Sequence, residues 1–190
     1  MTKNKILIVE DERITAEDLK NTLENMGYEV TGMASSEDTF YKSLHAVMPD
    51  LVLMDIFLKG KKDGIELATE IKEKYQLPVI YLTAYSDTNI LDRAKITEPF
   101  GYILKPFQER ELHSNIEMAL HKNRMEQRIN HLNTILKAIR DVNQLIMRVD
   151  TTVELLKKTC ETLISNRAYS SAWFITLDHT GMYLDSASAG

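Results

Sequence analysis

The sequence is poor in the residues that cross-link or interrupt a chain. Its 190 residues include one cysteine, four prolines and seven glycines. The lone cysteine, Cys160, cannot form a disulfide within the chain, which indicates a reducing compartment, and we expect it to be a small buried residue on a helix. No apolar run reaches the roughly 18 residues of a membrane-spanning helix, and the first residues lack the long apolar stretch of a signal peptide. These absences predict a cytoplasmic protein without a membrane partner.

Positive charge is also in deficit. The chain has 23 Lys and Arg residues against 28 Asp and Glu residues, a net charge of −5, so we expect no electrostatic attraction to nucleic acid or to an anionic membrane. The nucleotide-binding pattern G-x-x-x-x-G-K-[ST] is absent, which argues against a nucleotide hydrolase. What the chain does have is an apolar fraction of 44%, which is typical of a soluble globular protein.

Short apolar runs alternate with segments of helical spacing in the first half of the chain. This alternation predicts an α/β fold, with a parallel sheet, right-handed connections and helices on both faces. Gly27 is a predicted helix stop, and Ser35 or Ser36 is a predicted N-cap. The expected strands are 6–9, 28–33, 51–54, 79–82 and 102–104, and the expected helices are 14–26, 37–47, 65–75 and 86–96.

A long helix is predicted to follow from about residue 108, because glycine and proline are both absent between Phe107 and Thr180. Within it, apolar residues recur at alternating spacings of four and three, the repeat of a coiled coil, and one position of the series is an asparagine. We expect this helix to pair with a second copy; the alternative is a single amphipathic helix lying on its own domain. The series is Met125, Ile129, Leu132, Leu136, Ile139, Asn143 and Ile146.

The segment 151–190 looks like the opening of a second domain. A helix is expected up to residue 166, followed by two strands around a turn at 179–181, with Trp173 as a core residue. One helix and one hairpin cannot close a core, so we expect an incomplete α+β fragment. The predicted organisation is a first domain at 1–121, a linker helix at 122–150 and the fragment at 151–190.

Polar side chains follow four of the predicted strands at the point where each strand ends. Because the carboxyl ends of parallel strands share one edge of a sheet, these side chains should converge on one crevice. Taken singly, an acid can open a helix, a threonine can cap one and a lysine can lie on the surface. Their coincidence at four strand ends favours a functional site. The polar residues are Glu10, Asp11, Asp55, Thr83 and Lys105, and Ala84 comes directly after Thr83.

Three carboxylates at one edge repel one another, which favours either raised pKa values of the carboxyl groups or a bound cation. Oxygen ligands without a nearby histidine or cysteine select a hard ion, Mg²⁺ first and Mn²⁺ as the alternative. A carboxylate can be a nucleophile, and phosphoryl transfer requires mainly positioning and neutralisation of charge. We therefore expect Asp55 to accept a phosphoryl group, with Lys105 balancing its charge and the Thr83 hydroxyl donating a hydrogen bond to it.

The segments ILIVEDE, LVLMDIFL, VIYLTAY and GYILKPF resemble, in order and spacing, the four motifs of a response-regulator receiver domain. The resemblance covers about residues 3–121 and implies a flavodoxin-like five-stranded parallel sheet of order 2-1-3-4-5. It implies that Glu10, Asp11 and Asp55 form the metal site with the backbone carbonyl of Phe57.

Further roles follow from the same resemblance. It implies that Thr83, Ala84 and Lys105 contact the phosphoryl group, that Thr83 and Tyr102 form a switch pair, and that the Lys105–Pro106 bond is cis. The loop after Asp55 departs from the family pattern, because it is one residue longer and has Lys59 where proline is frequent. We expect the lysines of this loop to be solvated, with docking of a phosphodonor as the alternative.

The receiver resemblance implies a phosphorylation switch of a two-component system rather than an enzyme. The implied phosphodonor is a histidine kinase or a phosphotransfer protein. The implied homodimer uses the face of the fourth helix, fifth strand and fifth helix, or the linker helix. A receiver fold that serves as a phosphorylation-independent scaffold is the alternative. Residues 154–181 are in turn similar to the start of a GAF sensor domain.

Overall fold

The structure is a computed structural model that describes residues 3–59, 62–84, 93–95, 97–147, 149, 151–166 and 169–190. The chain divides into two compact units, Met1–Arg124 and Met125–Gly190, and the division lies within helix α5 (Glu109–Ile146). Most of the expected helix at 86–96 lies outside the described residues. Among the described residues, no helix combines the length and the apolar character that a membrane span requires.

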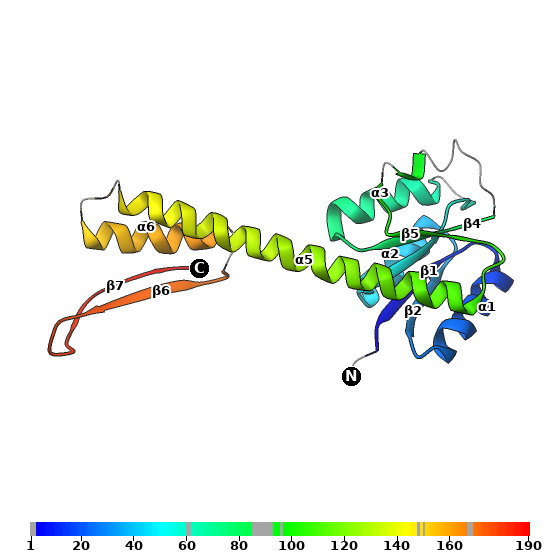
Figure 1. Cartoon of the computed structure of the whole chain (residues 1–190), viewed down its shortest axis with the longest axis horizontal. Coiled ribbons are helices and arrows are strands. Elements are labelled where there is room, and N and C mark those ends of the chain that lie inside the picture. The colour runs from blue at the N-terminus through cyan, green and yellow to red at the C-terminus, as the bar shows by residue number, and fades with distance from the viewer. Residues whose placement is uncertain are drawn as a thin grey trace. The chain divides into compact units, whose positions relative to one another are not determined.

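Unit 1 is built on one parallel sheet whose strand order is β2-β1-β3-β4-β5 (Figure 1). This order confirms the predicted flavodoxin-like topology. All five residues of β3 and of β4 are buried, as expected for apolar runs covered on both faces. The strands are β1 (Lys5–Val9), β2 (Glu29–Ala34), β3 (Leu51–Asp55), β4 (Val79–Thr83) and β5 (Gly101–Leu104).

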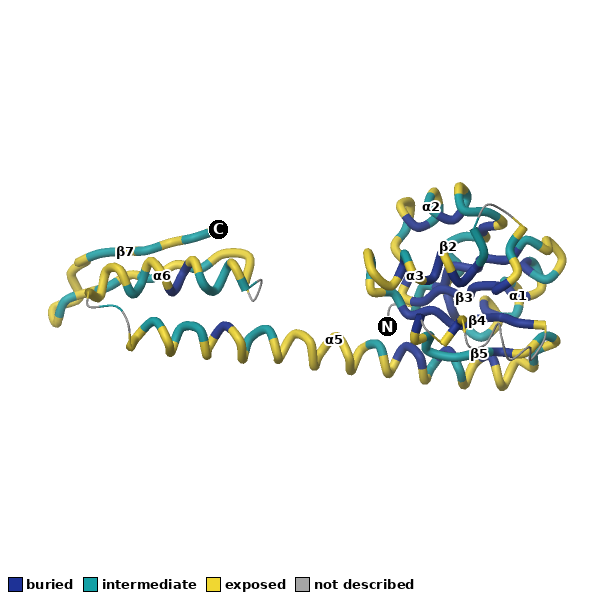
Figure 2. Tube along the Cα trace, turned by 90° about the horizontal axis from the view of Figure 1, so that it is seen from above, coloured by how far each residue is buried: buried dark blue, intermediate teal, exposed yellow. Residues whose placement is uncertain are grey.

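Helices cover both faces of this sheet, so each face has its own core (Figure 2). The first core joins α1 (Arg13–Asn25) and the first part of α5 to the sheet, and it contains Leu19 and Ile116. The second core joins α2 (Glu37–Ala46) and α3 (Gly64–Tyr75) to the opposite face, and it contains Phe40 and Leu67.

The helices begin and end where local side chains satisfy their terminal backbone groups. Ser36 is the N-cap of α2 and forms a reciprocal capping box with Thr39, as predicted for this serine. Asp63 and Glu66 form the same arrangement at the start of α3, so this helix begins at Gly64, one residue earlier than expected. Gly27 follows α1 with φ of 91°, a conformation that favours glycine and confirms the predicted helix stop.

Unit 2 contains the second part of α5, helix α6 (Thr152–Ser165) and the antiparallel strands β6 (Ala172–Leu177) and β7 (Tyr183–Ala189). Cys160 is fully buried, as predicted, and its thiol donates to the carbonyl of Ala187 at 3.4 Å. The expectation for Trp173 is wrong, because its side chain is 70% exposed. Alternation along β6 buries Phe174 partly and leaves Trp173 on the opposite face of the hairpin.

Candidate functional site

The strand register places the acidic residues at one edge of the sheet. Val9 of β1 lies opposite Met54 of β3, so the residues that follow, Glu10 and Asp55, leave adjacent strands at the same level. Carboxylate oxygens of Glu10, Asp11 and Asp55 all lie within 4.8 Å of one another. We call these three residues the acidic pocket. The structure therefore brings together the three acids that the sequence pattern placed at this edge.

Lys105 follows β5 and provides a positive charge inside the acidic pocket. Its ammonium group donates to Oδ2 of Asp55 at 2.7 Å and also to Oε2 of Glu10. Burial acts to lower the pKa of Lys105, but the hydrogen bonds to Asp55 and Glu10 outweigh it, and the pKa is raised. Burial raises the pKa of Glu10, although the hydrogen bond from Lys105 opposes this change. Burial of these charges depends on their mutual pairing.

Asp55 is held in one orientation by two donors. Oδ1 accepts a hydrogen bond from the backbone N–H of Phe57 at 3.0 Å, and Oδ2 accepts the bond from Lys105. Asp55 is only 6% exposed. On the Lys105 side, the pocket adjoins a hollow of about 460 Å³ that is lined by Ile14, Thr15, Asp18, Lys105, Pro106 and Phe107. The carboxylate is therefore fixed within the sheet edge and lies near an open approach from solvent.

Asp11 differs from the other two acids in its partners. Its Oδ2 atom is buried and accepts no hydrogen bond of good geometry within the described part of the chain. The ammonium of Lys59 lies 3.0 Å from this oxygen, although the Lys59 side chain is 89% exposed. An enclosed carboxylate oxygen beside two further carboxylates suits a hard cation such as Mg²⁺, which prefers oxygen ligands. The residues present therefore fit a divalent cation site.

The remaining predicted residues lie on β4 and β5 or directly after them. Thr83 ends β4 and is 1% exposed, whereas Ala84, the next residue, is exposed. The ring of Tyr102 lies 5.8 Å from that of Tyr81, and its hydroxyl is buried without a hydrogen-bond partner among the described residues. Burial raises the pKa of Tyr102. The Lys105–Pro106 peptide bond is cis.

The expectation that the lysines of the loop after Asp55 are solvated holds for Lys59, whose side chain is 89% exposed, and is wrong for Lys62, whereas Lys61 lies outside the described residues. Lys59 pairs with Asp11, as described above. Lys62 is 32% exposed and pairs with Glu37 of α2 at 2.6 Å and Glu70 of α3 at 2.5 Å. A lysine next to a glycine in a loop is ordinarily expected to be solvated. No local sequence pattern therefore predicts the ion pairs of Lys59 and Lys62. The capping pattern D-x-x-E at 63–66, in contrast, was available to locate the start of α3.

The fold and the site together define a flavodoxin-like α/β domain with an acidic pocket and a lysine at the carboxyl edge of its sheet. Residues 6–117 match the sequence model of a family described as "Response regulator receiver domain". The chain belongs to this family, whose members act in two-component signalling with phosphodonor kinases.

The chain is also similar to curated proteins that are named as transcriptional regulators. The chain is 35% identical over 120 residues to the transcriptional regulatory protein PdtaR of Mycobacterium tuberculosis, covering 63% of this chain and 58% of that protein. It is 34% identical over 135 residues to the probable transcriptional regulator ycf27 of Guillardia theta, covering 70% of this chain and 52% of that protein. The chain thus spans little more than half the length of these curated relatives.

Solved structures extend the comparison to the fold. The signal receiver domain of a modulated diguanylate cyclase from Desulfovibrio desulfuricans G20 is 38% identical, with a TM-score of 0.62 over 66% of this chain and 99% of that chain. The N-terminal domain of a response regulator/sensory box/GGDEF 3-domain protein from Carboxydothermus hydrogenoformans is 33% identical, with a TM-score of 0.60 over 65% of this chain and 98% of that chain.

Proposed function

We propose that the chain is a phosphorylation switch in which Asp55 accepts a phosphoryl group from a histidine kinase or a phosphotransfer protein. The observation that carries the proposal is the geometry of Asp55, a buried carboxylate that lies within 4.8 Å of two further acids and accepts a hydrogen bond from Lys105. Glu10, Asp11, Asp55 and the backbone carbonyl of Phe57 would hold Mg²⁺ or Mn²⁺. When bound, the cation supplies positive charge for the phosphoryl oxygens.

The proposed transfer is a displacement at phosphorus. A carboxylate oxygen of Asp55 forms a new P–O bond, and the P–N bond of the donor phosphohistidine breaks as the imidazole leaves with the bonding electron pair. The product is an acyl phosphate on Asp55. The Lys105 ammonium balances the added negative charge, and Thr83 and Ala84 contact the phosphoryl oxygens. With acetyl phosphate as donor, the broken bond is a P–O bond and acetate leaves.

Acetyl phosphate tests the proposal without knowledge of the kinase. Incubation with acetyl phosphate and Mg²⁺ is expected to add the mass of one phosphoryl group to the wild-type protein, as measured by intact-protein mass spectrometry. Asp55→Asn should gain none, because an amide is not a nucleophile here, and removal of Mg²⁺ with a chelator should suppress the gain. Asp38→Asn, an exposed acid on α2, is the matched control and should behave as the wild type. No gain in any variant favours the scaffold alternative.

We further propose that Thr83 and Tyr102 transmit the phosphorylated state. A buried hydroxyl without a hydrogen bond costs on the order of 1–3 kcal/mol, and the Tyr102 hydroxyl is in this condition among the described residues. A rearrangement of β5 that gives the Tyr102 hydroxyl a hydrogen-bond partner would therefore remove this cost. Most of the fourth helix, which the proposed face for dimerisation includes, lies outside the described residues, so β5 and α5 are the main described parts of that face.

We propose that the predicted apolar series on α5 joins two copies of the chain. Six of its members are 45–63% exposed, although they are large and apolar. Ala138, on a neighbouring face of α5, is 1% exposed, so the helix packs within unit 2 through a different face and leaves the series open to a partner helix. The exposed members are Met125, Ile129, Leu132, Leu136, Ile139 and Ile146, and Asn143 of the series is also exposed.

A charge within the series should weaken the dimer. We expect Leu136→Lys to raise the dimer dissociation constant by at least about tenfold, because a buried ammonium group at the centre of a paired seam has no partner there. Analytical ultracentrifugation measures the constant. Asn130→Lys, which adds the same charge at an exposed position outside the series, should leave it nearly unchanged. A monomeric wild-type protein at all concentrations would rule the dimer out.

We also propose that unit 2 includes the start of a GAF-like sensor domain at 151–190. The packing of α6 against the β6–β7 hairpin supports this proposal, since the Cys160 thiol of α6 contacts the Ala187 carbonyl of β7. In this interpretation the part of α5 from residue 122 to Ile146 provides most of the linker predicted at 122–150, which connects the phosphorylation switch to the sensor.

A further inference from the structure

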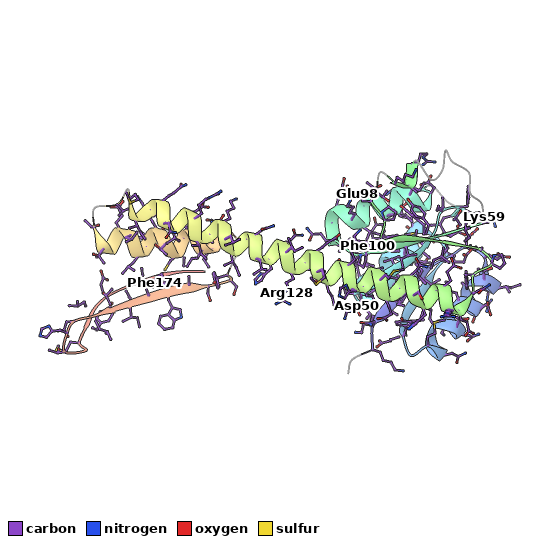
Figure 3. All side chains as sticks on the ribbon, in the orientation of Figure 1. Asp50, Lys59, Glu98, Phe100, Arg128 and Phe174 are labelled. Atoms are coloured by element: carbon purple, nitrogen blue, oxygen red, sulfur yellow. The ribbon has the colours of Figure 1, made fainter. Side chains whose placement is uncertain are left out.

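Lys59 is a surface lysine that reaches into the acidic pocket from outside. It lies in the loop between β3 and α3, at the end of unit 1 where α1 and α5 begin (Figure 3). Its side chain is 89% exposed, yet its Nζ atom lies 3.0 Å from Oδ2 of Asp11, a side chain that is only 12% exposed. One end of the ion pair is therefore fixed in the protein and the other is free to leave for solvent.

The charges of the acidic pocket are divided between two lysines. Lys105 pairs with Glu10 and Asp55, and Lys59 pairs with Asp11. The Lys105 side chain is 17% exposed and has two carboxylate partners, so its displacement would leave two enclosed charges unbalanced. Displacement of Lys59 breaks a direct ion pair with one carboxylate, that of Asp11. Lys59 is thus the replaceable cation of the two.

The contact between Lys59 and Asp11 is an ion pair whose hydrogen-bond geometry is poor. The distance of 3.0 Å is that of a hydrogen bond, but Asp11 Oδ2 accepts no hydrogen bond of good geometry from any described residue. A long exposed side chain also loses rotamer freedom when it is held in one place, which makes such pairs weak. A divalent cation has twice the charge and coordinates the oxygen directly, so it competes well for the same atom.

We propose that the Lys59 ammonium is an internal counter-ion of the acidic pocket, and that a divalent cation must displace it from Asp11 in order to bind. The inference rests on the proposed cation site. Lys59 thereby sets the affinity of the pocket for Mg²⁺: it neutralises Asp11 in the metal-free protein and returns to solvent when the cation binds. By linkage, the cation weakens the Lys59–Asp11 pair by the same factor as the pair weakens cation binding.

Isothermal titration calorimetry with MgCl₂ tests this competition directly, without phosphorylation. Lys59→Met should bind Mg²⁺ about two- to fivefold more tightly than the wild type, the range expected for loss of one exposed ion pair. Lys59→Arg retains a positively charged side chain, so its Mg²⁺ affinity should stay close to that of the wild type. The matched control is Lys74→Met, which makes the same charge change at the far end of α3, where Lys74 lies 3.6 Å from Glu70.

Ionic strength separates the proposed electrostatic role from a steric one. The difference between Lys59→Met and wild type should shrink when KCl is added, because salt screens an exposed charge, whereas obstruction by the side chain would not respond to salt. Equal Mg²⁺ affinities in Lys59→Met and Lys74→Met would overturn the inference and leave the cation site intact. No Mg²⁺ binding by any of the proteins would overturn the cation site itself, and with it this inference.

Discussion

Replacing Lys105 by methionine is expected to lower the free energy of unfolding of unit 1 by about 3 kcal/mol in the absence of divalent cations. The side chains of Glu10 and Asp55 are 1% and 9% exposed, and both accept hydrogen bonds from this ammonium group. Methionine fills similar space but leaves two enclosed carboxylates facing each other. Burial already raises the pKa of Glu10. Protonation of this side chain therefore limits the loss of stability.

Hydrogen–deuterium exchange of the β1 and β3 amides measures this loss in unit 1 alone, because core strand amides exchange through global opening of their own unit. Saturating Mg²⁺ should restore most of the lost stability, since the cation replaces the missing positive charge and binds only the folded pocket. Lys72→Met, which removes an exposed partner of Glu98, should change stability by less than about 1 kcal/mol. Equal exchange rates in Lys105→Met and wild type would mean that the pocket does not hold its charges as described.

The second large effect is expected at Gly64, where α3 approaches the backbone of Asp55. A Cβ atom on Gly64 would lie 1.9 Å from the carbonyl oxygen of Asp55 and 3.1 Å from the Cα of Ile56. The amide of Gly64 also donates to the Ile56 carbonyl at 3.1 Å, so the two segments cannot separate without losing a hydrogen bond. We expect Gly64→Ala to destabilise unit 1 by about 3 kcal/mol or more, the upper range for added volume in a packed site.

The same exchange measurement, combined with the acetyl phosphate assay, checks this expectation. Because the clash is with the main chain of Asp55 itself, Gly64→Ala should slow phosphorylation as well as destabilise the fold. Gly101→Ala is the matched control: its Cβ would lie 3.3 Å from the side chain of Asn115, which can move, and little change is expected. Wild-type stability in Gly64→Ala would contradict the close approach of α3 to Asp55.

The sheet was predictable from local patterns in the sequence. The apolar runs at 51–54 and 79–82 are buried on both faces of the sheet, and this burial requires the uninterrupted hydrophobicity that identifies them. Strand boundaries shifted by one residue, as at β2, which begins at Glu29 instead of Tyr28. Tyr28, which precedes the strand, packs into the first core, because most of its side chain is apolar.

The acidic pocket was predictable for a different reason: it is a consequence of topology. Once the strands are parallel, whatever follows each of them lies at one edge, so Glu10, Asp55 and Lys105 meet although 95 and 50 residues separate the two acids from the lysine. The pairings of Lys59 and Lys62 were not predictable in this way. They depend on where flexible side chains reach in space, and no periodicity or spacing in the sequence records that.

The register between β1 and β3 has a consequence for assembly. Val9 lies opposite Met54, and a shift of this pairing by one residue would turn Asp55 toward the opposite face, away from Glu10. Binding of a small ion at the proposed site thus requires the neighbouring strands β1 and β3 to be paired in this register. Mg²⁺ bound at the proposed site would therefore stabilise the sheet only when its strands are paired in the correct register, and would not stabilise a misaligned sheet.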